Sequence, residues 1–96
     1  MPAQDMLLLT ILSEAVLEDI LIDEIMALGA KGYTITEARG RGTHGVRTGK
    51  WSAGGNIRID VIGAPDLCAR IVARLQAEYE KDYGLLMFTC PVQMQN

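Results

Sequence analysis

The first half of the chain joins a continuous apolar run to a helical pattern. Residues 6–12 are apolar apart from one threonine and predict a strand buried on both faces. Ser13 and Glu14 then offer a cap oxygen and a first-turn acid for a helix. Apolar residues recur at helical spacing over residues 17–28, and Gly29 can end this helix in the left-handed conformation. The pattern therefore predicts a strand followed by an amphipathic helix.

The second half repeats this order after another strand and a long irregular stretch. Residues 32–39 are rich in Thr and Ile and predict a strand. Apolar and polar residues alternate from Ile57, which predicts a third strand, and Pro65 suits the first position of a second helix. Gly84 would end that helix, and residues 85–92 predict a fourth strand.

This order of elements indicates one fold class. Two strand-helix-strand units predict an α+β fold, the ferredoxin-like βαββαβ sandwich, as a single domain over residues 1–96. Its two helices would cover one face of the sheet, so we expect an oligomer to cover the other. A fragment of a larger α/β protein is the alternative, and the short polar ends argue against it.

Composition excludes several classes of protein. Apolar residues make up 49% of the 96 residues, which is too many for a disordered chain. No apolar stretch reaches the roughly 20 residues of a membrane span, and the N-terminus lacks the pattern of a signal peptide. Cys68 and Cys90 lack a CxxC spacing and are expected to be buried thiols in a reducing cytoplasm. Because His44 is the single histidine, no metal site is expected.

The net charge of −3 hides an uneven distribution of charge along the chain. Residues 39–58 hold five of the nine bases and no acid, which leaves four bases and twelve acids elsewhere. The acidic remainder argues against nucleic-acid binding. The basic segment instead predicts an anion site in one loop.

This loop is rich in glycine as well as in bases. Its start, GRGTHG at residues 40–45, matches GxGxxG, but no helical pattern follows, and the spacing before Lys50 does not fit a P-loop. Glycines let successive backbone N–H groups converge on an anion. Further donors would come from Arg41, Thr43, His44, Arg47 and Lys50. A solvated hairpin tip is the alternative interpretation.

We expect the two parts of the loop to behave differently. Ordering every residue of so long a loop would cost on the order of 20 kcal/mol, more than one small ligand offsets. Residues 40–47 would therefore bind the ligand, while residues 48–55 stay mobile until a partner or second ligand orders them. Trp51 is the candidate partner contact, because exposed Trp side chains often anchor interfaces.

Four features carry a resemblance to a known family. They are Ser13-Glu14 after the first strand, Asp23-Glu24 with GAKGYT at residues 29–34, GRGTHGVR at residues 40–47, and Asp82-Tyr83-Gly84 before the last strand. With them the sequence resembles the PII-like signalling proteins over nearly its whole length. The resemblance is closest to the carboxysome-associated PII proteins and to the PII-like regulator of the sodium-dependent bicarbonate transporter.

The resemblance implies a homotrimer with adenine nucleotide in the clefts between subunits. It also implies a long flexible T-loop at about residues 40–56, whose base holds the phosphates. The matching nucleotide-binding positions are Gly40, Arg41, Gly42, Thr43, His44, Gly45 and Arg47. The turn before the last strand of the neighbouring subunit would add backbone groups of Gly84 and Leu85. ADP or AMP is the favoured ligand, ATP and cyclic AMP are further candidates, and no resident cofactor is expected.

The implied function is that of a sensor and not of an enzyme. Nucleotide, together with bicarbonate near Arg47 and Lys50, would change the conformation of the T-loop and so regulate inorganic-carbon uptake or carboxysome function. The target would be a bicarbonate transporter or a carboxysome component. The protein would be cytoplasmic, with any membrane or carboxysome association made through that partner.

Departures from the family pattern leave alternatives open. The chain stops at Asn96 without the Cys-bearing extension of the transporter regulators, so redox-coupled nucleotide hydrolysis is not expected. Residues 84–96 lack bases, which argues against tight ATP and 2-oxoglutarate binding. One alternative is a CutA-type metal-binding trimer, in which His44, Cys68 and Cys90 would converge. Another is a weak nucleotide hydrolase that uses Glu37, Asp60 and His44.

Overall fold

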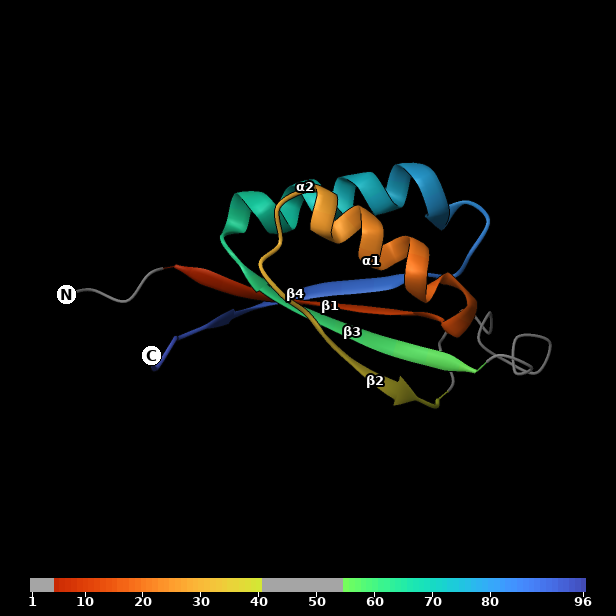
Figure 1. Cartoon of the computed structure of the whole chain (residues 1–96), viewed down its shortest axis with the longest axis horizontal. Coiled ribbons are helices and arrows are strands. Elements are labelled where there is room, and N and C mark those ends of the chain that lie inside the picture. Colours follow the sequence, from red (N-terminus) through yellow and green to blue (C-terminus); the bar gives the residue numbers. More distant parts are fainter. Residues whose placement is uncertain (1–4, 41–54) are drawn as a thin grey trace.

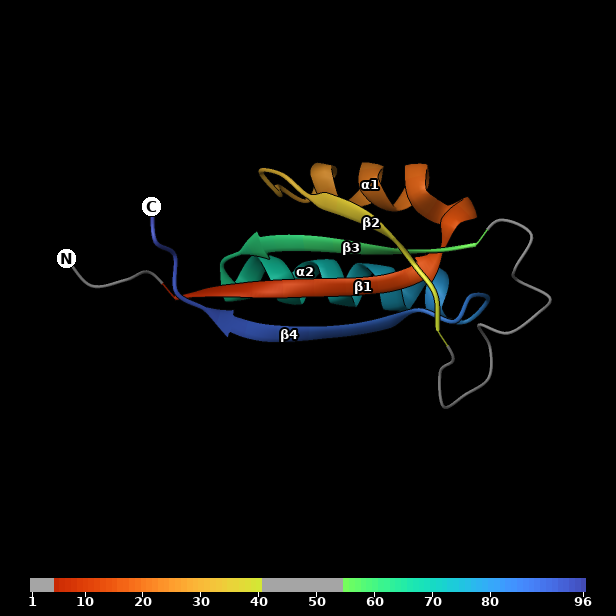
Figure 2. The ribbon, with the colours of Figure 1, turned by 90° about the horizontal axis from the view of Figure 1, so that it is seen from below.

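The computed structural model describes residues 5–40 and 55–96. In chain order its elements are β1 (Met6–Glu14), the 3₁₀ turn η1 (Ala15–Leu17), α1 (Glu18–Ala27), β2 (Thr34–Ala38), β3 (Asn56–Gly63), α2 (Pro65–Leu75), the π-helical turn η3 (Gln76–Glu80) and β4 (Leu86–Val92). The strands form one antiparallel sheet in the order β2-β3-β1-β4. Both helices lie on one face of this sheet (Figure 1), and the view from below looks onto its other face (Figure 2). The predicted ferredoxin-like α+β sandwich is confirmed.

The core between the helices and the sheet is aliphatic. Alternate side chains of β1 and β3 point toward the helices, because successive residues of a strand face opposite sides of the sheet. The fully buried aliphatic side chains at this interface are Leu9, Ile11, Ile59 and Val61 of the sheet and Leu21, Ile25, Ile71 and Leu75 of the helices. Each such side chain contributes about 1.5–3 kcal/mol through burial. This layer fixes the sheet and therefore the positions of the strand ends.

Two predicted helix signals are confirmed. Gly29 follows α1 with φ of 113°, a left-handed conformation that favours glycine. Pro65 begins α2, where the absent N–H group costs no helical hydrogen bond. Gly84 lies several residues beyond the end of α2, because the chain first continues as η3.

The prediction that Ser13 and Glu14 begin the first helix is wrong. Both residues belong to β1, where Ser13 pairs with Ile57 and Glu14 with Asn56. The Ser13 side chain is fully buried, and its hydroxyl donates to the Glu14 carbonyl (3.0 Å) and caps no helix. The strand extends this far because Ser13 continues the inward-facing row of Leu9 and Ile11. As a result, β1 carries the chain to the same end of the sheet as the start of β3.

Only one of the two cysteines is buried as predicted. Cys68 in α2 is 1% exposed, and burial raises the pKa of its thiol. Cys90 is exposed on the edge strand β4, opposite Leu8 of β1. Leu8 alternates with the inward-facing Leu9, so Cys90 lies on the face of the sheet away from the helices. The prediction of a buried Cys90 is therefore wrong for the single chain.

Candidate functional site

Several chain segments with predicted roles meet at one end of the sheet. The strand pairings place the end of β1 beside the start of β3, since Glu14 pairs with Asn56. Ala38 at the end of β2 pairs with the same Asn56, and Leu86 at the start of β4 pairs with Leu12. Gly40, Gly55 and the turn before β4 therefore lie at a common end, on the right in Figure 1.

Gly55 secures the return of the loop into the sheet. Its carbonyl accepts a hydrogen bond from the Ala15 N–H (2.9 Å), which ties the start of β3 to the start of η1. Its φ of 72° lies in the left-handed region, which residues with a Cβ adopt only at a cost. The base of the loop is thus fixed by a backbone hydrogen bond and by a conformation that glycine favours.

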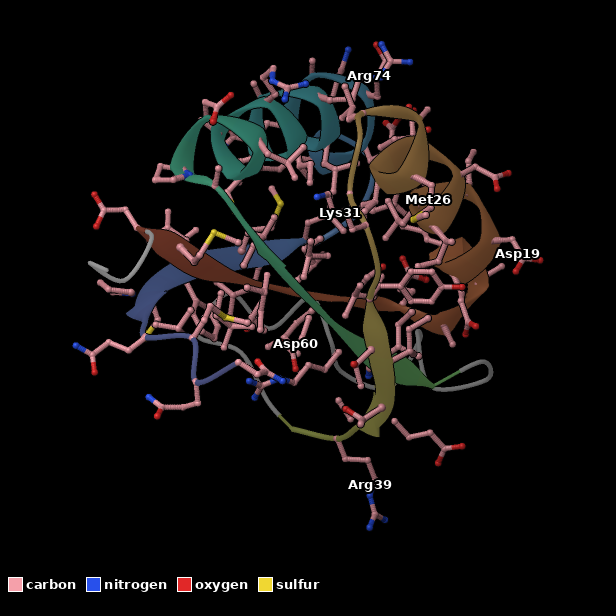
Figure 3. The ribbon with its side chains drawn as sticks, turned by 60° about the vertical axis from the view of Figure 1, so that its left-hand side comes forward. Asp19, Met26, Lys31, Arg39, Asp60 and Arg74 are labelled. Atoms are coloured by element: carbon pink, nitrogen blue, oxygen red, sulfur yellow. The ribbon has the colours of Figure 1, made fainter. Side chains whose placement is uncertain are left out.

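A hollow of about 670 Å³ lies beside this loop base, between the end of β2, the start of β3 and the start of α1. Its charged and polar lining residues are Glu18, Thr36, Glu37, Arg39 and Asn56. Among the described residues, no hydrogen-bond partner reaches the buried Oδ1 of Asn56, which is therefore an unsatisfied acceptor in the wall of the hollow. Figure 3 shows Arg39 extending outward from the end of β2.

Acids surround the described part of the loop base. Glu14 lies at the end of β1, and burial raises the pKa of its carboxyl group above the ordinary value. Glu18 and Glu37 line the hollow beside Arg39. An anion bound here would therefore need the further bases of residues 41–50.

Most of the predicted nucleotide-binding residues lie outside the described residues. They are Arg41, Gly42, Thr43, His44, Gly45 and Arg47, together with the anion candidate Lys50 and the partner-contact candidate Trp51. Gly40 is described and follows the end of β2 by two residues. The proposed roles of the others stay predictions.

The turn before β4 is described in full and narrows the possible role of Leu85. The Leu85 N–H donates to the Tyr83 carbonyl (2.9 Å) and closes a three-residue γ-turn around Gly84. This N–H is therefore already paired within the chain. A ligand contact at Leu85 would use its carbonyl or its side chain.

A second hollow, of about 410 Å³, lies on the face of the sheet away from the helices and was not predicted. Its lining residues are Leu8, Gly32, Tyr33, Thr34, Asp60 and Ile62. Apolar side chains with one carboxylate and two hydroxyls could hold a flat ring that carries a hydrogen-bond donor. Local sequence contains no signal for this hollow, because its residues come from three strands and a connection.

Asp60, one of the acids considered for catalysis, is held in a hydrogen-bonded network. Its carboxylate accepts from the Thr10 hydroxyl (2.8 Å) and from Nε of Arg58 (3.1 Å to each oxygen). Figure 3 shows Asp60 near the middle of β3. These contacts give Asp60 a structural role on this face of the sheet.

The described residues offer no support for a metal centre. Within residues 5–40 and 55–96, no group of three His, Cys, Asp or Glu side chains could hold a metal ion. Cys68 lies in α2 and Cys90 on the opposite face of the sheet, so these two ligands of the CutA-type alternative do not converge. His44 lies outside the described residues. No helix in the described part of the chain is long and apolar enough to cross a membrane.

Comparisons with known proteins give the family. The family model for nitrogen regulatory protein P-II matches residues 6–95. A solved structure of a PII-like signalling protein from Thermus thermophilus is 39% identical in sequence to this chain. The match covers 98% of this chain and 92% of that chain, with a TM-score of 0.80. A search of curated proteins finds no match.

A second solved structure has the same fold at lower identity. It is CPII, a nitrogen regulatory PII-like protein of Thiomonas intermedia, in complex with ADP, AMP and bicarbonate. CPII is 21% identical, with 98% of this chain and 99% of that chain covered and a TM-score of 0.81. The family model spans nearly the whole chain, and the chain therefore belongs to the nitrogen regulatory protein P-II family.

Proposed function

We propose that this chain is a PII-like sensor that binds adenine nucleotide, ADP or AMP in particular, at the base of the loop between β2 and β3. The observation that carries the proposal is the common end of the sheet, where Gly40, Gly55 and the turn at Gly84 and Leu85 all lie. CPII, which shares the fold, binds ADP, AMP and bicarbonate. The acid-free basic segment supplies the charge that phosphates need.

The phosphates would be held by the glycine-rich start of the loop. Backbone N–H groups of residues 40–45 can converge on an anion, and Arg47 can add a forked, charge-assisted pair of donors. Arg41, Thr43 and His44 supply further donors. The acids at Glu14, Glu18 and Glu37 would disfavour anions elsewhere on this rim, which supports a phosphate site in the basic part of the loop.

A homotrimer is part of the proposal, because within one chain the described loop base and the turn lie at the same end of the sheet but do not adjoin each other. The loop leaves from β2 and returns to β3, whereas the turn precedes β4, two strands beyond β3 in the sheet. At a strand spacing of roughly 4.8 Å, about 10 Å separates β3 from β4. A neighbouring subunit would supply the turn at Gly84 and Leu85 to the loop base.

The uncovered sheet face supports the same assembly. Ile62, Leu86 and Phe88 are 44%, 45% and 46% exposed. The strand register places all three on the face away from the helices, beside Leu8 and Leu12. Exposed apolar patches of this kind usually mark an interface.

The regulatory part of the proposal rests on the loop beyond the phosphate site. Bicarbonate would bind near Arg47 and Lys50, and the resulting loop conformation would be read by a target protein through Trp51. The proposed target is a bicarbonate transporter or a carboxysome component. A ligand shifts a loop equilibrium only by its different affinity for the two conformations, so nucleotide and bicarbonate must both discriminate between them.

We propose a non-enzymatic role. Asp60 is engaged by Arg58 and Thr10, and Glu37 is an exposed residue of the edge strand β2. Steady release of phosphate or AMP from nucleotide, abolished by His44→Ala, would instead establish the hydrolase alternative.

A ligand screen tests the proposed function. Thermal unfolding of the purified protein would be followed with ADP, AMP, ATP and cyclic AMP, each with and without bicarbonate. We expect the largest increase in Tm with ADP or AMP, because ligands that bind the native state stabilise it. The absence of any shift with all four nucleotides, in both conditions, would overturn the proposal.

A further inference from the structure

The second helix reaches the turn before β4 through an unusual segment. Helix α2 ends at Leu75 and continues as the π-helical turn η3, which contains Tyr79. Single π-helical turns are rare and are often found at functional sites. In this chain η3 lies directly before residues 81–85, the segment that contains Gly84 and Leu85, which the proposed function assigns to nucleotide binding.

The backbone of Tyr79 anchors this segment. The Tyr79 carbonyl accepts hydrogen bonds from the N–H groups of Asp82 (3.2 Å) and Tyr83 (2.9 Å). The Tyr83 carbonyl in turn accepts from Leu85. The position of Gly84 and Leu85 is therefore set by a short series of hydrogen bonds that starts at Tyr79.

The side chain of Tyr79 ties this anchor to the other helix. Its ring packs against the core, and its hydroxyl donates to Oε2 of Glu24 in α1 (2.6 Å). The second oxygen of Glu24 accepts from Nε of Arg74 in α2 (3.0 Å). We call these three residues, Glu24, Arg74 and Tyr79, the helix clamp; Figure 3 shows Arg74 at the outer surface of α2.

Protonation states favour the helix clamp at neutral pH. The hydrogen bond to Glu24 raises the pKa of Tyr79 to about 12, so its hydroxyl stays a donor. The hydrogen bonds from Tyr79 and then Arg74 lower the pKa of Glu24, so its carboxylate stays a charged acceptor. Glu24 retains only 16% exposure, and hydrogen bonds to a charged acceptor are stronger than neutral ones.

We propose that Tyr79 is a positioning residue of the nucleotide site: held by Glu24, it fixes the turn at residues 82–85 in the place from which a neighbouring subunit's nucleotide is contacted. The inference rests on the proposed function, because it assigns that turn to the ligand. The hydroxyl of Tyr79 would then affect nucleotide affinity without touching the nucleotide.

The chain contains a matched control for this effect. Arg70 also joins α2 to α1, because its Nη1 donates to the Leu28 carbonyl at the end of α1 (3.1 Å). Its Nη2 lies 3.9 Å from Asp66. Both contacts lie away from the segment at residues 81–85, so Arg70→Met removes a tie between the helices without disturbing the anchor at Tyr79.

Calorimetric titration with ADP provides the first readout. We expect Tyr79→Phe to weaken ADP binding about three- to tenfold, the effect of losing one hydrogen bond to a charged group that preorganises the site. Arg70→Met should leave the affinity within about twofold. Glu24→Gln keeps an oxygen that can accept from Tyr79 and should give an intermediate affinity, whereas Glu24→Ala should match Tyr79→Phe. Unchanged ADP affinity in Tyr79→Phe would show that the helix clamp is only structural and would overturn the inference.

Amide hydrogen exchange without ligand provides a readout that is independent of nucleotide. The N–H groups of Tyr83 and Leu85 should exchange faster in Tyr79→Phe than in the wild type, and Arg70→Met should leave them unchanged. If the wild type binds no nucleotide, the proposed function fails while this comparison still decides whether the helix clamp positions the turn. Equal exchange rates in Tyr79→Phe and the wild type would contradict it.

Discussion

At the scale of single residues, the two glycines at the loop base, Gly40 and Gly55, differ in backbone conformation. Gly55 has a φ of 72°, and an added Cβ would meet no atom within 4 Å, so only its conformation restricts substitution. An added Cβ at Gly40 would also meet no atom, and Gly40 lacks a positive φ. Because space is open at both positions, the pair isolates the effect of backbone conformation.

We expect Gly55→Ala to lower the free energy of unfolding by about 1–2 kcal/mol, because an L-residue in the left-handed conformation is strained. Gly40→Ala should change it little, since alanine also restricts the unfolded chain. Urea unfolding without ligand measures both values. An equal loss in the two variants would contradict this account of Gly55.

Individual residues could be predicted where one local rule decides their position. Gly29 and Pro65 follow helix-end rules that depend on their own backbone, and both predictions are confirmed. Ser13 could not be predicted, because its place in β1 depends on pairing with Ile57, far along the chain. Cys90 was wrongly predicted as buried, because the composition of β4 does not show which of its faces the helices cover.

At the scale of elements, Glu24 of α1 contacts Arg74 of α2 and Tyr79 of η3. These two residues lie 50 and 55 positions further along the sequence. Hydrophobic periodicity predicted both helices, because each buries one apolar face. The helix clamp and the change to η3 have no such local signal. They arise only when the two helices pack side by side.

The helix clamp should make stability depend on pH in acid. Folding lowers the pKa of Glu24 below its ordinary value of 4.5. A lowered carboxyl pKa contributes stability that is present above the unfolded value and is lost as pH falls through the folded value. The Tm of the wild type should therefore exceed that of Glu24→Gln at pH 7, and the difference should shrink below about pH 4.5.

Thermal unfolding between pH 7 and pH 3 measures this difference. Asp66→Asn is the control, because it removes an exposed carboxylate in the first turn of α2, whose pair with Arg70 at 3.9 Å contributes little. A difference in Tm between the wild type and Glu24→Gln that stays constant from pH 7 to pH 3 would show that the charge of Glu24 does not stabilise the helix clamp.

At the scale of the whole molecule, the proposed site depends on how subunits assemble through the uncovered sheet face. The loop base and the turn lie at the same end of the sheet but on different strands. The sequence predicts a binding segment at residues 40–50, because motif and charge lie in one stretch, and this role stays a prediction. The hollow beside Tyr33 and Asp60 could not, because it forms only when three strands align.

Assembly through this face can be tested with one charged substitution. Phe88 is 46% exposed on the face away from the helices, and Phe88→Glu should convert a trimer into monomers of 10.5 kDa, since a buried unpaired charge is costly. Val16→Glu is the control, because Val16 is 73% exposed in η1, outside the sheet. Light scattering after size-exclusion chromatography gives the mass. A wild-type mass of 10.5 kDa, or a trimeric Phe88→Glu, would contradict the proposed assembly.

The central claim is that adenine nucleotide binds at the base of the loop, and calorimetric titration of ADP into the wild type and Arg47→Ala tests it most directly. We predict one ADP per chain for the wild type and an affinity at least about tenfold weaker for Arg47→Ala, because a charge-assisted contact to phosphate is lost. Arg70→Ala removes the same charge from the surface of α2 and should bind ADP like the wild type. Equal affinity in Arg47→Ala and the wild type, or no binding of ADP to the wild type, would contradict the account.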